Sequence, residues 1–555
     1  MSFLTRLHQL YYYSTLIRSF FTPLIIIFVI YLFIRPYISY FKSRSYRAPG
    51  PIPLPFIGYL SILIGDVAEN NFRLSKKYGD ICEIEMFGYR YVLISNPSLL
   101  KDLFSPSVNS AFLRRMPLMP GFKELGMDKE GLLLNLDIPK WRHNRKFFQQ
   151  SLSPPSFVEL STKYTRECCG EMMEYWNDIE QDTVVRLDHW YRAFTSDMMG
   201  LVAAGNKEDS LKVLHRKVVM KESSSRRETD EKYQPSKGEI YRRLREDYAE
   251  ALNFFVFVPK FVWNLPFIKE KCKHYRETLN SLTEFEIDFI KERKEIIKAE
   301  SNKRKRSADS SKELVGFNRT LISGNNSKVR PDFLTMLLTT NEDDDPTPDD
   351  IKQNLREMFS AGTGTTTTTL CAITYLLAKH PEIERRMVEE ILSVVGPDRE
   401  VEPLDLPKLE YTEAVLNESV RLYPVVPVTY RFTSDQSTEI SGYNFPPNTL
   451  FAINLGHIHR DARYFKEPEK FNPDRFMGNW REKLPQYAFS PFGHGMRSCP
   501  GKNFSITEIK VILATIYRKY TFRLVNSKEP LHLKFAAVND ITKMEVFVEK
   551  RDGVN

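Results

Sequence analysis

The sequence predicts a mainly α-helical protein with a small β region, built as one large domain behind a single apolar N-terminal segment. Apolar residues recur at helical spacing over most of the chain, and strand-like runs are confined to two short regions. No repeat of roughly 20 to 50 residues is present, which excludes solenoids and propellers. With 555 residues, 42% of them hydrophobic, the chain is long enough to bury a sizeable core.

The charge balance argues against nucleic acid as a partner. Lysine and arginine number 79 against 71 aspartate and glutamate, and this mild excess is spread along the chain rather than gathered on one stripe. The one dense basic cluster, Lys303–Arg306, is flanked by polar residues, so we expect a solvated loop there. Six cysteines without a Cys-x-x-Cys pair indicate reduced thiols rather than a disulfide framework or a zinc ribbon.

The N-terminal residues 1–47 carry the segment most typical of a membrane anchor. Residues 19–34 contain no charged side chain and lie between Arg18 and Arg35. As a helix they would cover about 24 Å of a hydrocarbon layer about 30 Å thick, and the flanking arginines can extend toward the headgroups. A cleaved signal peptide is the alternative, but no small-residue cleavage site follows. We therefore expect one uncleaved span at residues 19–34.

Residues 48–58 predict a stiff hinge between this anchor and a domain over residues 59–555. Proline recurs at every second position from 49 to 55, which excludes a continuing helix and favours extended backbone. Beyond the hinge, Ile81–Met86 and Tyr91–Ser95 predict a β-hairpin, and residues 439–453 predict a second β-rich region.

Prolines also mark two later segments. The acidic and proline-rich stretch before Asp349 is typical of a helix start, so we expect a long helix from Asp349 to Lys379. Residues 251–268 are strongly apolar but contain Pro259 and Pro266, which argues against a second membrane span. We expect a buried or membrane-touching loop there.

The strongest chemical signal lies near the C-terminus, where the chain reads Phe492-Gly493-His494-Gly495-Met496-Arg497-Ser498-Cys499-Pro500-Gly501. Its glycines allow tight turns and a close approach of the backbone to a flat ligand. A lone cysteine is most often a buried inert thiol. The spacing Phe-x-x-Gly-x-Arg-x-Cys-x-Gly, however, arises by chance with a probability on the order of 10⁻⁴ or less, which favours a functional motif.

This motif resembles the signature of the cytochrome P450 family of haem-thiolate proteins at every fixed position. The resemblance covers nearly all of the chain from Pro49 onward and implies the cytochrome P450 fold with haem b as cofactor. It implies that Cys499 supplies a thiolate to the haem iron, because a thiolate pushes electron density that favours O–O cleavage. Arg497 would pair with a haem propionate, and Phe492 and Gly501 would complete the cofactor-binding loop.

Other elements of the family pattern occur in the expected order. Glu418 and Arg421 match Glu-x-x-Arg, in which one helical turn brings two side chains onto one face. With Arg475 they would form a buried structural ion network, whereas a surface ion pair is the alternative for Glu-x-x-Arg alone. The resemblance also implies propionate contacts for three residues that could otherwise be a core tryptophan and solvated arginines: Trp141, Arg145 and Arg431.

Residues 361–366, Ala-Gly-Thr-Gly-Thr-Thr, resemble the family's oxygen-activating stretch. Gly costs about 1 kcal/mol relative to Ala in a helix, so a function is expected to offset that loss. The resemblance implies that Thr365 is catalytic and helps to deliver protons. The alternative is a structural role, in which the threonine side chains donate hydrogen bonds to carbonyls of their own helix and bend it. Most relatives carry Asp or Glu in place of Gly364, which leaves a haem-thiolate isomerase or dehydratase open.

The reaction that the resemblance implies inserts one oxygen atom of dioxygen into a lipophilic small molecule and reduces the other to water. No dinucleotide-binding Gly-x-Gly-x-x-Gly follows a strand, so electrons would come from an NADPH-cytochrome P450 reductase, with cytochrome b5 as a candidate second donor. A non-catalytic haem sensor is a further alternative. The expected location is the endoplasmic reticulum membrane, with one span and the catalytic domain in the cytosol.

Two remaining sets of residues have weaker signals. His457 and His459 cannot complete a metal site by themselves, so we expect structural roles for both. The residues expected to line a substrate pocket are mostly apolar and fall in three segments: Phe112, Leu118, Phe359, Ala361, Val425 and Val428.

Overall fold

The computed structural model describes residues 67–551, apart from 87–88, 118, 219–234, 259, 308–331, 340–345, 434 and 536–537. Before residue 67 it describes 22–23, 30–31, 34, 37–38, 40–41, 47–54 and 59. Most of the predicted anchor at residues 19–34 therefore lies outside the described residues. Within the described part of the chain, no helix is both long enough and apolar enough to cross a bilayer.

Helices account for most of the described chain. The α-helices are α2 (Val67–Tyr78), α3 (Pro120–Glu124), α4 (Ile138–Leu152), α5 (Pro155–Asn177), α6 (Leu187–Ala204), α7 (Ser210–Val218), α9 (Lys237–Phe257), α10 (Pro266–Ser307), α12 (Phe333–Leu338), α13 (Pro348–Lys379), α14 (Pro381–Val395), α15 (Glu410–Leu422), α16 (Leu455–Ile458), α17 (Trp480–Lys483) and α18 (Lys502–Ile516). Short 3₁₀ turns are η3 (Pro97–Leu99), η4 (Lys260–Asn264), η6 (Leu406–Lys408), η7 (Pro473–Phe476) and η8 (Gly495–Arg497).

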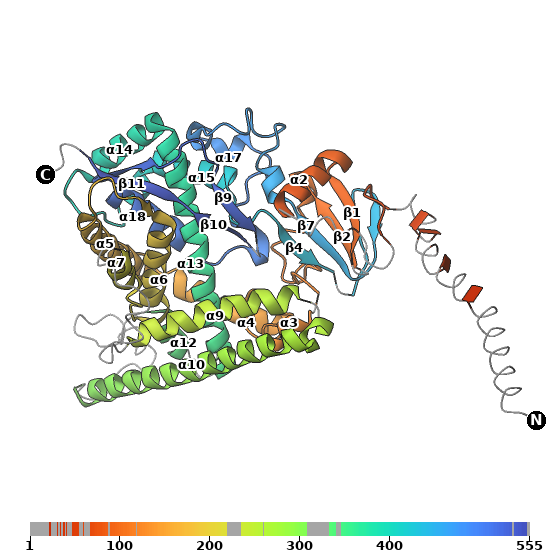
Figure 1. Ribbon diagram of the computed structural model, residues 1–555, viewed down its shortest axis with the longest axis horizontal. Helices are drawn as coiled ribbons and strands as arrows, with labels where there is room; N and C mark the ends of the chain where they lie inside the picture. Colours follow the sequence, from red (N-terminus) through yellow and green to blue (C-terminus); the bar gives the residue numbers. More distant parts are fainter. Residues whose placement is uncertain are drawn as a thin grey trace, which may run out of the picture.

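The long helix α13 confirms the helix predicted from Asp349 to Lys379. Its start has a capping box, in which the Thr347 side chain accepts from the backbone N–H of Asp350 and the Asp350 carboxylate accepts from that of Thr347. Pro348 occupies the first helical position, where its missing N–H costs nothing. In Figure 1, α13 runs through the middle of the helical part, and α9 and α10 cross one of its ends.

In the described residues the strands form four small sheets. They are β1 (Ile81–Met86), β2 (Tyr89–Ile94), β3 (Val185–Arg186), β4 (Thr429–Phe432), β5 (Thr438–Ile440), β6 (Tyr443–Phe445), β7 (Thr449–Ile453), β8 (Tyr520–Leu524), β9 (His532–Phe535), β10 (Asn539–Lys543) and β11 (Glu545–Lys550). The largest sheet has the order β1-β2-β7-β4, with β2 and β7 parallel and the other pairs antiparallel.

Both predicted β regions are confirmed. The hairpin is the antiparallel pair β1 and β2, and residues 439–453 contain β5, β6 and β7. The C-terminal strands β8 to β11 were not predicted from the sequence. Since β8 and β11 pair with each other and β9 pairs with β10, these strands depend on partners that a local pattern does not reveal.

Two predicted loops are wrong, because the structure has helix there. The first half of residues 251–268 belongs to α9, and only the turn η4 separates it from α10. The segment Lys303–Arg306 forms the end of α10. Lysine and arginine are good helix formers, and cations are favoured near a helix C-terminus, so a basic cluster is compatible with helix here.

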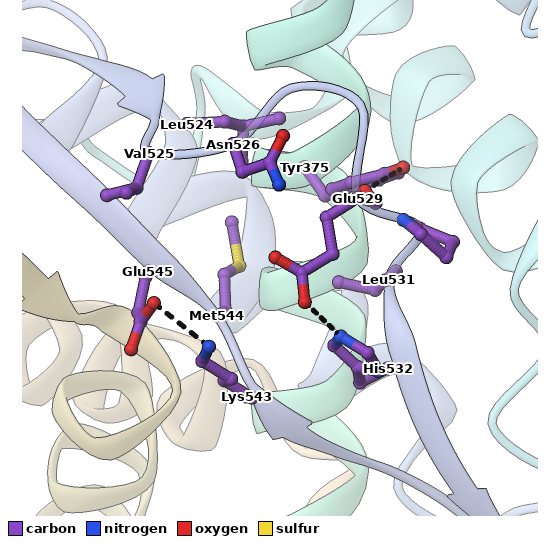
Figure 2. Close-up of a pocket in the computed structure, with 11 residues that line it drawn as sticks. Tyr375, Leu524, Val525, Asn526, Glu529, Leu531, His532, Lys543, Met544 and Glu545 are labelled. Atoms are coloured by element: carbon purple, nitrogen blue, oxygen red, sulfur yellow. Dashed lines mark hydrogen bonds and ion pairs between the residues drawn. The ribbon is translucent and has the colours of Figure 1, made fainter.

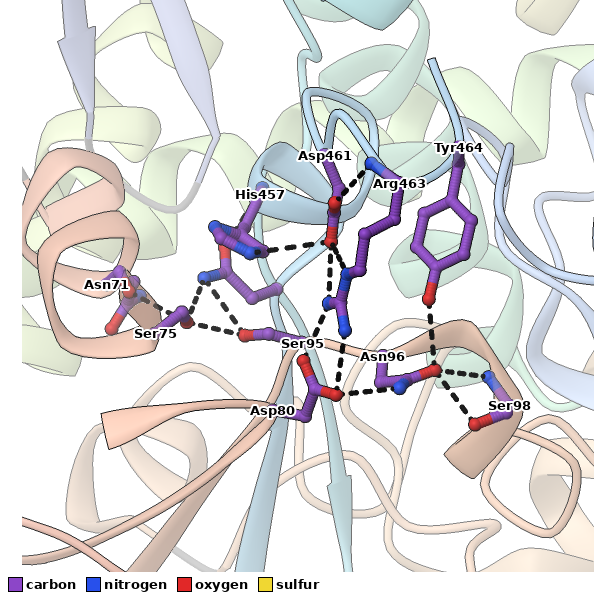
Figure 3. A network of polar contacts seen from close by, with 11 residues as sticks. Asn71, Ser75, Asp80, Ser95, Asn96, Ser98, His457, Asp461, Arg463 and Tyr464 are labelled. Carbon is purple, nitrogen blue, oxygen red and sulfur yellow. Dashed lines mark hydrogen bonds and ion pairs between the residues drawn. The ribbon is translucent and has the colours of Figure 1, made fainter. Parts of the chain in front are cut away.

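A polar network joins α2 and the loops beside β1 and β2 to the segment that contains α16 (Figure 3). The Asn454 side chain donates to Ser75 on α2, 3.0 Å away. Arg463 donates to both carboxylate oxygens of Asp80, at 2.6 and 3.0 Å, and Asn96 donates to the same carboxylate. These contacts hold residues 454–463 against α2 and against the loops that contain Asp80 and Asn96.

Candidate active site

The backbone of the segment Phe492–Gly501 forms a tight loop before α18. The Cys499 N–H donates to the Phe492 carbonyl at 2.8 Å, which closes the loop. Gly495 has a φ of +68°, and a Cβ there would lie 2.3 Å from the Phe104 carbonyl oxygen. Glycine is therefore required at this position both for its dihedral angle and for the close approach of a neighbouring chain.

The Cys499 side chain is exposed by surface area, yet burial raises the pKa of its thiol. The sulfur is thus surrounded by protein atoms while part of the residue's own surface stays accessible. The Gly501 N–H and the positive charges of Arg115 and Arg145 oppose the effect of burial and lower the pKa. The surroundings of Cys499 therefore already contain groups that favour a thiolate.

Arg497 lies beside this loop and is only 4% exposed. Its guanidinium donates to three backbone carbonyls, those of Leu113, Leu132 and Asn135. Its Cζ atom lies 4.0 Å from the centre of the Trp141 ring, which is fully buried on α4. The Trp141 indole N–H has no hydrogen-bond partner within the described chain.

Three more arginines from separate segments lie near Arg497. Arg145, one helical turn after Trp141, donates to the carbonyl oxygen of Ser498 at 2.5 Å. Arg115 donates to the carbonyl oxygen of Arg497 at 3.0 Å. Arg431 on β4 is 2% exposed and donates to the Leu103 carbonyl at 3.0 Å. Throughout the described residues, no salt bridge joins any of the four guanidiniums to a carboxylate.

The mutual repulsion of these charges appears in their pKa values. Burial, with Arg115 and Arg431 as further causes, lowers the pKa of Arg497 to about 8. Burial, followed by Arg115, lowers the pKa of Arg431 to about 9. A cluster of buried cations without an ion-paired carboxylate is costly, so this arrangement suits a ligand that brings negative charges.

Comparison with known proteins identifies the kind of ligand. The family model described as Cytochrome P450 matches residues 48–545. The chain belongs to the cytochrome P450 family. It is a haem-thiolate monooxygenase of that family, and haem is the cofactor that the family implies.

Several named P450 relatives and one solved structure align over most of the chain. Cytochrome P450 3A17 of Cavia porcellus is 26% identical over 87% of this chain and 86% of its own length. The 6,7,8-trihydroxycoumarin synthase of Pastinaca sativa is 26% identical over 91% of this chain and 92% of its own. Aromatase of Oryctolagus cuniculus is 24% identical over 85% of this chain and 81% of its own length.

The fold itself is that of a solved P450. The crystal structure of the cytochrome P450DA heme domain superposes with a TM-score of 0.72 at 19% sequence identity. The alignment covers 91% of this chain and 97% of that chain. The prediction of a mainly α P450 fold is thereby confirmed.

The residues present fit a haem in this P450. Haem carries two propionate carboxylates, and the four guanidiniums lack an ion-pair partner of that kind within the described part of the chain. The Cys499 thiol lies close enough to Arg115 and Arg145 for their charges to affect its pKa. The guanidiniums would therefore bind the anionic carboxylates of haem, and the Cys499 sulfur would bind its metal cation.

The predicted oxygen-activating stretch of the P450 lies in the middle of α13. There, residues 360–365 are exposed or half-buried, although α13 is mostly buried on either side of them. Thr365 Oγ1 donates to the Ala361 carbonyl at 2.5 Å. A Cβ on Gly364 would meet nothing within 4 Å, whereas one on Gly362 would lie 2.2 Å from the Met199 sulfur.

The threonines of α13 also bond to their own helix. Thr363, Thr367 and Thr369 each donate to the carbonyl four residues earlier, as Thr365 does. This is the back-bonding that the alternative interpretation expected. The two interpretations are compatible, because a hydroxyl that donates to a carbonyl keeps its lone pairs free to accept another hydrogen bond.

Glu418 and Arg421 lie on α15 and are both fully buried. Arg421 donates to both oxygens of Glu418, at 2.6 and 2.8 Å, and Arg475 donates to the same carboxylate at 3.3 Å. Further hydrogen bonds from Arg421 reach the carbonyls of His459 and Pro468. The structure therefore brings these three side chains together away from Cys499.

The candidate pocket residues lie in different surroundings. Phe359 packs against Tyr241 and lies under the guanidinium of Arg245. Phe112 and Val428 are buried in two clusters that pack on the large sheet. Leu118 lies outside the described residues. The two candidates that keep accessible surface are Ala361, which is exposed, and Val425, which is half-buried.

Sequence reasoning missed Arg115 and Glu357. Arg115 lies in a segment without a recognisable motif, and its contact with Arg497 joins residues 382 positions apart. Glu357 lies one helical turn before Ala361 and accepts from the backbone N–H groups of Leu132 and Leu133. In the sequence Glu357 continues a polar stripe of α13 that includes Gln353 and Asn354, and no motif distinguishes it from them.

Two other features lie apart from this site. Figure 2 shows a small pocket of about 40 Å³ whose lining includes Tyr375, Glu529, His532 and Lys543, and none of the predicted site residues.

His459 accepts from the Ser490 N–H through Nε2, and burial lowers its pKa to about 3, so it is neutral. No group of three or more metal-ligating side chains occurs in the described residues.

Proposed function

We propose that this P450 inserts one oxygen atom of dioxygen into a lipophilic small molecule, using electrons from an NADPH-cytochrome P450 reductase. The observation that supports this most directly is the set of four arginines around Cys499, none of them ion-paired within the described residues. Buried charges of one sign destabilise a fold unless a partner compensates them. A cofactor with two negative charges, bound beside a thiolate, would compensate these four arginines.

In this proposal Cys499 is the ligand of the iron in haem b. The propionates would be held by Arg497, Arg145 and Arg431, together with Arg115, which was not predicted from the sequence. Bound haem supplies the oxygen chemistry, since a thiolate ligand pushes electron density that favours O–O cleavage.

The other loop residues prepare this ligand. The Gly501 N–H points at the Cys499 sulfur and stabilises its negative charge. Phe492 holds the Cys499 N–H through its carbonyl. Trp141 covers one face of the Arg497 guanidinium and so limits its access to water.

Thr365 is proposed to pass protons within the site. Thr365 is half-buried, so its oxygen can accept a hydrogen bond from water while its hydroxyl, rotated away from the Ala361 carbonyl, donates a proton onward. The hydroxyl receives a proton from that water as it gives up its own. Gly364 supplies no acid beside it. The open space around Gly364 suits water as the proton source in place of the missing carboxylate.

The proposed substrate contacts are Ala361 and Val425, because both are apolar and keep accessible surface. An apolar wall favours a lipophilic substrate through the hydrophobic effect. Residues 362–365, which are glycine and threonine and half-buried, would leave room next to this wall for a small ligand such as dioxygen.

The chain is further proposed to be a single-pass protein of the endoplasmic reticulum, with residues 1–47 as anchor, 48–58 as hinge and 59–555 as the cytosolic domain. Cytochrome b5 is a candidate second electron donor. Membrane contact is supported at η4 and the start of α10, where Phe261 and Phe267 are 79% and 78% exposed. Exposed aromatic side chains of this size are typical of an interface.

The test combines spectroscopy with turnover. The full-length chain, expressed with a haem precursor, should show the thiolate-type Soret band in its reduced carbon monoxide complex. Supplied with reductase and NADPH, it should yield products that contain one oxygen atom from ¹⁸O₂ when incubated with a panel of lipophilic compounds. Product formation that is independent of NADPH and of dioxygen would refute the oxygen-insertion proposal.

A further inference from the structure

Glu357 and Arg497 contact the same peptide group from opposite sides. The Leu133 N–H donates to Glu357 Oε2 at 3.0 Å, and the Leu132 carbonyl of that same peptide accepts from Arg497 Nη1 at 2.9 Å. The Leu132 N–H also donates to Glu357 Oε2, at 2.5 Å. Because hydrogen bonds in a chain polarise one another, the carboxylate strengthens the carbonyl as an acceptor for the guanidinium.

The loop is shaped to accept this carboxylate. Gly131, just before Leu132, has a φ of +74°, and a Cβ there would lie 2.5 Å from Glu357 Oε1. Glu357 itself is 8% exposed. A carboxylate held this closely by backbone N–H groups is fixed in position, and so is the peptide that it holds.

Glu357 also supplies negative charge to the arginine cluster. Burial, opposed by the Leu132 and Leu133 N–H groups, raises the pKa of Glu357 to about 7, so the carboxylate carries its full charge only above that pH. In the ionised form it raises the pKa of Arg115 and of Arg497, in opposition to burial and, for Arg497, to the neighbouring arginines. Its other oxygen, Oε1, has no hydrogen-bond partner in the described residues. The carboxylate therefore forms no structural ion pair among the described residues. It affects the arginines in two ways, by its hydrogen bonds to the Leu132–Leu133 loop and by its charge.

We propose that Glu357 is a positioning residue for Arg497. Its carboxylate orients the peptide between Leu132 and Leu133, so that Arg497 is held ready to bind an anionic group of the cofactor. This proposal rests on the proposed haem-binding function of Arg497. It predicts that removal of the Glu357 charge weakens haem retention more than it weakens the fold.

The chain offers a matched control in Asp197 on α6. Its buried carboxylate accepts from two successive backbone N–H groups, those of Ser210 and Leu211, as the Glu357 carboxylate does in its own loop. Asp197 holds the start of α7. Among the described residues its hydrogen-bond and ion-pair partners are Ser210, Leu211 and Lys207, none of which belongs to the loop that contacts Arg497. A purely structural role would make Glu357→Gln and Asp197→Asn behave alike.

The experiment measures haem transfer from each purified holoprotein to excess apomyoglobin, followed by absorbance, together with the thermal unfolding midpoint. We expect Glu357→Gln to lose haem about tenfold faster than the wild type, and Asp197→Asn to lose it within about twofold of the wild-type rate. Equal rates for the two variants would overturn the proposal. A wild-type protein that holds no haem would instead refute the proposed function on which it rests.

A second pair of variants keeps the charge and moves the carboxylate. Gly131→Ala places a methyl group against Glu357 Oε1, whereas Gly126→Ala has a similar φ of +70° and meets nothing within 4 Å. We expect faster haem loss for Gly131→Ala alone. This pair also decides the question if Glu357→Gln cannot be purified.

The last arm tests whether Glu357 acts through Arg497. On an Arg497→Lys background, the point-charge ammonium no longer bridges the same carbonyls, so Glu357→Gln should add less than about twofold to the rate of haem loss. A full additional tenfold effect would show that Glu357 acts independently of Arg497 and would overturn the positioning role.

Discussion

Arg115 Nη2 lies 3.0 Å from the backbone oxygen of Arg497, so one guanidinium is held against the main chain of another residue of the same cationic cluster. The four arginines come from the segment before α3, from α4, from β4 and from η8. Because no one segment could hold them together, the cluster exists only in the folded chain.

Arg115→Gln is expected to weaken haem retention by about tenfold or more. A charge-assisted hydrogen bond contributes roughly 1.5 to 3 kcal/mol, and about 1.4 kcal/mol corresponds to a factor of ten. Arg518→Gln is the matched control, because Arg518 is also buried and donates to backbone carbonyls, those of residues 396, 397 and 399. Haem titration of both apoproteins compares them, and equal losses would count against a cofactor role for Arg115.

Cys499→Ser is expected to abolish the thiolate-type Soret band of the reduced carbon monoxide complex. The hydroxyl is close to the thiol in size, so the loop from Phe492 should keep its shape and some haem should still bind. Cys371→Ser, which changes a fully buried thiol on α13, is the control and should keep the band. An unchanged spectrum in Cys499→Ser would exclude this sulfur as the iron ligand.

The two glycines of α13 are expected to respond oppositely to alanine. Gly364→Ala should raise stability by about 0.5 to 1 kcal/mol, since Ala is the better helix former and the added methyl group meets nothing within 4 Å. Gly362→Ala should lower it by about 1 to 3 kcal/mol, because the methyl group overlaps the Met199 side chain. Thermal unfolding of the two holoproteins checks both signs.

Arg421→Leu is expected to lower the free energy of unfolding by roughly 3 to 5 kcal/mol, because Glu418 would remain buried without its main partner. Arg73→Leu breaks an exposed ion pair with Glu69 and should change it by less than about 1 kcal/mol. Denaturation by urea compares the two. Similar small effects would mean that the α15 pair behaves as a surface salt bridge.

Glu508 on α18 is expected to make stability fall as pH rises. Neither of its oxygens has a hydrogen-bond partner in the described residues, and burial raises its pKa to about 8. Above the ordinary carboxyl pKa the unfolded chain ionises while the folded chain stays protonated, so stability is lost until the folded group ionises too, near pH 8.

The check is the difference in unfolding midpoint between Glu508→Gln and the wild type. That difference should favour the variant increasingly from about pH 5 to about pH 8 and then level off, because the amide never ionises. Glu384→Gln serves as a comparison: burial raises the pKa of Glu384 too, but its partners Thr521 and Arg551 oppose that effect, so the pH-dependent difference should be smaller. A constant difference across the range would show that Glu508 finds a partner in solution.

The sequence by itself determined the family, the mainly helical class, the β1–β2 hairpin and the start of α13. Each of these depends on local information: a motif of ten consecutive residues, a proline before a capping box, or a short alternation of side chains. The same local information named Cys499, Arg497 and Thr365, because their neighbours in the chain identify them.

Only the tertiary structure decided which distant residues surround those positions. Arg115 and Glu357 carry no local pattern, and their partners lie more than 200 positions away in the chain. Phe359 is apolar, as a pocket residue is expected to be, and its ring packs under the guanidinium of Arg245 because α9 lies against α13 at this position. Burial and charge depend on contacts between segments, so the electrostatics of the site arise only when the chain folds.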